Sequence, residues 1–193
     1  MHTYNEANTH ELILAHQHRV QLYEQAKRNA DSGFLHNEYD RKRYLDELFS
    51  HRVIAQLSEV KAELASHGYG SELEIKTEQL EHNNMVVDVI YEVVFTFNGT
   101  PVNDPPISSD DSQMVFFTQS GSTYLACRYK TALVSSQIQA LYFDDEGYSH
   151  FLAQVGSKTL WHEHTHSHSE LSSLISDFIA LNFIQKRANL SRI

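Results

Sequence analysis

Apolar residues recur at helical spacing in two stretches near the start of the sequence. In residues 8–30 and again in residues 38–66 they follow one another at steps of three and four, which places them on one face of a helix. Asn37 precedes the second stretch, where it can cap the helix, and Gly68 follows it, where a left-handed residue can end the helix. Two such helices joined by a short connection pack as antiparallel neighbours. The pattern therefore predicts an N-terminal helical hairpin over residues 8–66.

The period of the pattern changes from 3.6 to two after these helices. Leu73 and Ile75 alternate with charged residues, and every odd position of residues 85–97 is apolar. This alternation is typical of strands with one buried face. Shorter segments with strand character are residues 113–118, 123–130, 137–143 and 158–165, while residues 148–155 fit a strand or a helical turn equally well. We therefore expect an antiparallel sheet of five or six strands over residues 71–166.

A loop and a final helix complete the expected fold. Residues 99–112 are rich in Pro, Ser and Asp and have no period, so we expect a mobile connector there. Ser167 and Glu170 stand three apart ahead of a helical stripe, as in a capping box, which predicts a C-terminal helix over residues 167–188. Runs of helix followed by runs of strand indicate an α+β fold. We expect residues 1–193 to form one domain, with the helices packed on one face of the sheet.

Composition and charge narrow the classes of function. The chain has 193 residues, of which 41% are hydrophobic, and a formal net charge of −10. This length allows one domain with its own core, and the acidity disfavours nucleic-acid binding, which needs basic side chains to displace counterions. The lone cysteine, Cys127, suits a reducing compartment. The sequence shows neither a basic start followed by an apolar run nor an apolar stretch of about 18 residues. We expect a small, acidic, soluble protein of the cytoplasm, with no membrane span.

The best candidate for a chemical site is a histidine-rich segment just ahead of the predicted last helix. Its candidate metal ligands are His162, His164, His166, His168 and Glu170. In a strand, His162 and His164 point to one side and can share a zinc ion at Zn–N distances of about 2.0–2.1 Å. His168 and Glu170 would then stand at the helix start and complete the shell. The alternatives are a pH-sensitive joint, because crowded imidazoles repel one another once protonated, and an exposed polar connection that holds no metal.

Part of this segment resembles a metal motif of the cupin family. Gly156, the two imidazoles of His162-Glu163-His164 and the downstream Glu170 follow the order in which that family holds a metal with two His and one Glu inside a β-barrel. The interval from His164 to Glu170 is longer than the motif requires, and the predicted helix leaves no strands for the family's second motif. The sequence is therefore not assigned to that family.

No other catalytic pattern stands out. The sequence contains no phosphate-binding glycine loop, nucleophile elbow, Cys-x-x-Cys pair or zinc-protease His-Glu-x-x-His. Cys127 lies in a predicted strand, where we expect a buried, inert thiol. No catalytic or cofactor-binding residue is assigned beyond the zinc candidates. The sequence favours a non-enzymatic protein-binding or regulatory module, chaperone-like or immunity-like, that engages another protein or forms a homodimer. The alternative is a zinc-dependent hydrolase or metal sensor built on residues 162–170.

The metal hypothesis predicts that the untagged protein carries zinc. The His162→Ala/His164→Ala double variant should lose that zinc, because two of the expected ligands are removed. Elemental analysis of both proteins measures the difference. Equal metal content in the two would remove the hypothesis.

Overall fold

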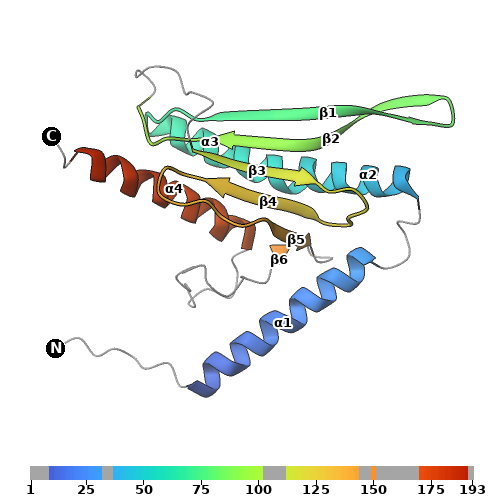
Figure 1. The fold of residues 1–193 in the computed structure, drawn as a ribbon, viewed down its shortest axis with the longest axis horizontal. Helices are drawn as coiled ribbons and strands as arrows, with labels where there is room; N and C mark the ends of the chain where they lie inside the picture. Colours follow the sequence, from blue (N-terminus) through green and yellow to red (C-terminus); the bar gives the residue numbers. More distant parts are fainter. Residues whose placement is uncertain (1–8, 32–36, 102–111, 144–148, 151–169, 191–193) are drawn as a thin grey trace.

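The computed structural model describes residues 9–31, 37–101, 112–143, 149–150 and 170–190. Its helices are α1 (Thr9–Asp31), α2 (Glu38–Leu48), the π-helical segment η1 (Phe49–Ile54), α3 (Ala55–Ser66) and α4 (Glu170–Leu190). Its strands are β1 (Glu72–His82), β2 (Met85–Thr96), β3 (Gln113–Thr118), β4 (Leu125–Lys130), β5 (Gln139–Phe143) and β6 (Ser149–His150). Helices and an antiparallel sheet occupy separate stretches of the chain, so the predicted α+β fold is confirmed (Figure 1). Within these ranges, no helix has the length and apolar character needed to cross a membrane.

The sheet is a six-stranded meander in which each strand pairs antiparallel with the next, in the order β1-β2-β3-β4-β5-β6. The β1–β2 hairpin reaches well beyond the other strands (Figure 1). It turns at Asn83 and Asn84, which both have positive φ, as tight two-residue hairpins require. Part of the ambiguous segment 148–155 is strand β6. The predicted strand over residues 158–165 lies outside the described residues, as does most of the predicted loop 99–112.

The second predicted helix is one uninterrupted helical stretch made of α2, η1 and α3. At its start, the side-chain oxygen of Asn37 accepts a hydrogen bond from the backbone N–H of Asp40 at 2.8 Å. Just past its end, Gly68 takes a φ of 81°. Both predicted ends are therefore confirmed. The middle is wound as a π-helix, which the spacing of apolar residues does not indicate, and it buries Phe49 and Val53 completely.

One face of the sheet carries the hydrophobic core. Strand residues of this face pack against the α2–α3 helix and against α4. The largest buried side chains of the core are Phe49, Phe95, Phe97, Phe116 and Phe178. Complete burial of a side chain of this size stabilises the fold by roughly 1.5–3 kcal/mol. The expectation that the C-terminal helix packs on the sheet is therefore confirmed.

The first helix, α1, meets the opposite face of the sheet. Tyr142 stands in β5 between two core residues, Leu141 and Phe143, so the alternation of the strand turns it to the other face. Tyr23 of α1 packs against Tyr142 with ring centroids 5.4 Å apart and an interplanar angle of 84°. α1 and α2 run in opposite directions (Figure 1), but they lie on opposite faces of the sheet, so the predicted packing of the two as a helical hairpin is wrong. However, only the second of the two N-terminal helices covers the core face, which differs from the expectation that both would do so.

The packing of α4 can be tested with two substitutions on that helix. Phe178 is 0% exposed and Ile184 is 47% exposed. We expect Phe178→Ala to lower the free energy of unfolding by about 3–5 kcal/mol, because it leaves a cavity between α4 and the sheet. Ile184→Ala should change it by less than about 0.5 kcal/mol. Urea unfolding of both variants measures the difference, and equal effects would contradict this placement of α4.

Candidate functional site

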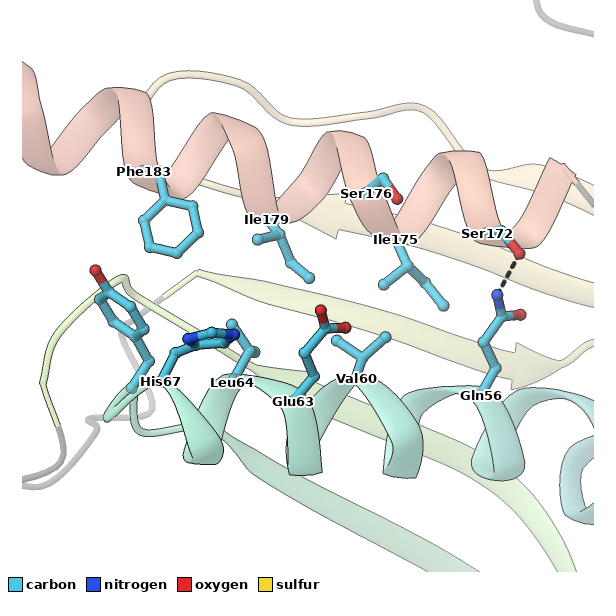
Figure 2. Close-up of a pocket in the computed structure, with 11 residues that line it drawn as sticks. Gln56, Val60, Glu63, Leu64, His67, Ser172, Ile175, Ser176, Ile179 and Phe183 are labelled. Carbon is cyan, nitrogen blue, oxygen red and sulfur yellow. Dashed lines mark hydrogen bonds between the residues drawn. The ribbon is translucent and has the colours of Figure 1, made fainter. Parts of the chain in front are cut away.

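A groove of about 400 Å³ runs between α3 and α4 on the outer side of the core. Figure 2 shows the two helices side by side, with Gln56 facing Ser172 at one end and His67 near Phe183 at the other. The two helices are therefore parallel. We call this feature the α3–α4 groove.

The groove is lined at matching intervals along both helices. α3 contributes Gln56, Val60 and Glu63, its C-cap residue His67 follows, and α4 contributes Ser172, Ser176, Ile179 and Phe183. In both sets the steps are four, three and four residues, which keep the side chains on one face of a helix. The eleven-residue span corresponds to about 16 Å at a rise of about 1.5 Å per residue. The two helices thus present two facing rows of side chains in register.

The floor and the walls of the groove are apolar. Leu64 and Ile175 are buried and form part of the core beneath it. Above them, Val60, Ile179 and Phe183 are only partly buried, although each packs against the core. Partly buried apolar side chains in a concave surface retain some area that a ligand can remove from water.

Both ends of the groove are closed by specific contacts. At one end the side-chain amide of Gln56 donates a hydrogen bond to the hydroxyl oxygen of Ser172 (Figure 2). At the other end the rings of Tyr69 and Phe183 meet edge to face with centroids 5.1 Å apart. Phe183 also contacts Phe97 of the core, with centroids 5.4 Å apart. These contacts hold the helices apart at a fixed distance and shape the groove in advance of any ligand.

The rim of the groove is polar. Glu63 and His67 lie on the α3 side and Ser176 lies on the α4 side, and all three residues are exposed. Glu63 and His67 are one helical turn apart, so a carboxylate and an imidazole stand beside the apolar walls. The rim can therefore exchange hydrogen bonds with polar groups of a ligand whose apolar part enters the groove.

The zinc candidates lie outside the part of the chain that the structure describes. This holds for His162, His164, His166 and His168, and for the side chain of Glu170, the first residue of α4. Among the described residues, no group of three or more His, Cys, Asp or Glu side chains is placed to hold a metal ion. The zinc site, the cupin-like segment and the Ser167 cap therefore stay predictions.

Cys127 is buried, as expected, on the core side of β4. Burial raises the pKa of its thiol well above the ordinary value, because the apolar core disfavours the thiolate. The thiolate is the reactive form of cysteine. A catalytic role for this residue is therefore not supported, in agreement with the inert thiol expected from the sequence.

The groove is the feature that the sequence pattern did not identify. Val60 is one of the apolar residues at helical spacing in residues 38–66, which predicts a place in the core. The last helix has apolar residues at helical spacing at Leu171, Leu174, Ile175, Phe178 and Leu181. Ile179 and Phe183 are additional apolar residues of that helix, and they are the signal that indicates a second apolar surface.

No family model matches this sequence, and comparisons with curated proteins and with solved structures find no similar protein. The geometry of the groove must therefore carry the functional argument.

The burial of Cys127 predicts how fast it reacts. Iodoacetamide at pH 8 should label the folded chain far more slowly than the urea-unfolded chain, because the raised pKa keeps the thiol protonated and the core excludes the reagent. The rate should rise with the urea concentration as the core opens. Mass spectrometry of quenched samples follows the reaction. Equal rates for the folded and unfolded chains would contradict the burial.

Proposed function

We propose that this chain is a non-enzymatic protein-binding module, and that the α3–α4 groove receives a helix of the partner protein. The observation that carries the proposal is the pair of facing rows in register, with half-buried apolar side chains between two parallel helices. A small apolar groove with a polar rim is the surface that amphipathic helices recognise.

The spacing of the lining residues supports a helix as the occupant. Steps of four and three residues are those of the a and d positions in a coiled coil, where side chains of one helix enter holes formed by the next. A third helix laid along the groove would meet such holes from both α3 and α4. The groove length of about 16 Å corresponds to three turns of such a helix.

The division between the apolar walls and the polar rim supports an amphipathic partner. Side chains entering between Val60 and Ile179 would be apolar, since those walls offer no hydrogen bond. Side chains facing Glu63 would be donors of hydrogen bonds, and a Lys, Arg or amide group suits that position. The pre-shaped ends of the groove lower the conformational cost of binding.

A non-enzymatic role agrees with the chemistry of the groove. Within the described lining, Glu63 and His67 stand on the exposed rim, where water competes for both groups. The lone Cys127 supports a reducing compartment for this module, and we place it in the cytoplasm. The zinc-dependent alternative rests on residues 162–170 alone and gains no support from the groove.

A photocrosslinking experiment in cells tests the proposal. A photoreactive phenylalanine derivative at Ser176 on the groove rim should form a covalent adduct with a polypeptide on illumination. The same group at Leu133, which is 56% exposed in the loop after β4, provides the control and should not form that adduct.

The Ile179→Glu substitution, combined with the probe at Ser176, should reduce the adduct at least about tenfold, because it places a charge in the apolar wall. Gel mobility and mass spectrometry identify the adduct. Equal yields at Ser176 and Leu133, or a yield that Ile179→Glu leaves unchanged, would rule out the groove as the binding site.

A further inference from the structure

The N-terminal half of α1 projects from the body of the protein. Residues 13–18 are all exposed, and among them Ile13 and Leu14 are 49% and 50% exposed. The C-terminal half is anchored, because Tyr23 packs against Tyr142 and Tyr142 against Tyr124. Figure 1 shows α1 leaving the sheet toward its N-terminal end. We call the projecting part, residues 9–18, the arm.

The arm and the α3–α4 groove are complementary surfaces on one chain. The arm presents two large apolar side chains that the described chain leaves half exposed, and the groove presents apolar walls that the described chain leaves partly uncovered. We infer that the arm of a second copy occupies the groove, and that two copies exchange their arms reciprocally to form a homodimer. This inference rests on the proposed function, since it names the partner that the groove receives.

The dimensions of the two surfaces agree. The arm spans ten residues of helix, which is about 15 Å, and the groove spans about 16 Å. Ile13, Leu14 and Gln17 fall on one side of the arm, because steps of three and four residues return to the same helical face. The two apolar side chains suit the walls formed by Val60 and Ile179. The amide of Gln17 can donate a hydrogen bond to a carboxylate such as that of Glu63 on the rim.

The negative charge is lower at this contact than on the β1–β2 hairpin. The chain carries a formal net charge of −10, so two copies repel each other unless they meet where the negative charge is low. The arm contains one acidic residue and no lysine or arginine, α3 contains two acidic residues and one lysine, and α4 contains two residues of each sign. The β1–β2 hairpin, by contrast, contains six acidic residues and one lysine. Its exposed edge strand is therefore a poor site for pairing with itself.

Reciprocal exchange doubles the contact area. A stable, specific interface buries roughly 1,200 Å² or more in total, and a single arm of about three turns is a small contact. A two-fold axis doubles it, because each copy both donates an arm and receives one. A dimer closed by reciprocal exchange has no free arm or groove with which to bind a third copy.

The experiment compares three variants of the full chain by sedimentation velocity. The arm variant is Ile13→Glu/Leu14→Glu, and the groove variant is Ser176→Arg, which places a bulky charged side chain at the exposed rim without burying a charge. The control is Ile184→Glu, an exposed site on α4 that does not line the groove. Circular dichroism melting checks that each variant is folded.

We expect the native chain and the control to be dimers. The arm and groove variants should each raise the dimer dissociation constant at least about thirtyfold, the size of effect that disrupting an interface hot spot produces. An equimolar mixture of the two should associate more strongly than either variant alone and more weakly than the native chain, because only one of the two arm–groove contacts is intact. In that mixture the intact arm of the groove variant meets the intact groove of the arm variant.

Three results would overturn the inference. They are a native chain that stays monomeric, variants that dimerise as well as the control, and a mixture that associates no more strongly than either variant alone. The crosslinking experiment at Ser176 separates this homodimer from the proposed binding function of the groove. A monomeric chain that still forms a groove-dependent adduct with a different polypeptide at Ser176 would retain the binding groove and exclude the second copy as its occupant.

Discussion

One apolar face of the sheet packs against two parallel helices, and both the core and the α3–α4 groove follow from this packing. Phe95 and Phe116 from the sheet and Phe178 from α4 are completely buried between these layers. Because α3 and α4 each direct their deepest side chains at the sheet, the next residues around each helix face one another across the gap. Val60 and Ile179 therefore line a groove as a consequence of how the core is filled. The same packing fixes the groove's shape, since the rings that close one of its ends also contact the core.

This arrangement links the fold to the function that we propose. A groove held by a core is rigid, so an entering helix finds its site already formed, and binding costs less conformational entropy. α1 is built differently, with one anchored half and one projecting half. A helix that leaves apolar side chains in water on its free half is less stable alone than when those side chains are covered. Covering the apolar side chains of the arm and of the groove would therefore stabilise both, and the described chain makes no such contact internally.

The elements that depend on local chemistry could be predicted from the sequence. Asn37 and Gly68 mark the two ends of a helix, because a capping side-chain oxygen and a left-handed glycine act on the backbone within a few residues. The alternation of residues 85–97 and the Asn83-Asn84 turn indicate a hairpin for the same reason. The face on which α1 lies, the π-helical turn at Phe49 and the groove could not be predicted, because each depends on distances between segments far apart in the sequence. Metal binding by the histidine-rich segment, residues 162–168, stays a prediction.

The most direct measurement is an isotope-filtered nuclear Overhauser experiment on a mixed sample. One population of chains carries labelled isoleucine methyl groups and the other is unlabelled, so the filter selects contacts between copies. We expect intermolecular contacts between the methyl groups of Ile13 in one copy and Ile179 in another. Contacts that involve only Ile75 or Ile184, which are exposed elsewhere, or no contacts between copies at a concentration where the chain is dimeric, would contradict it.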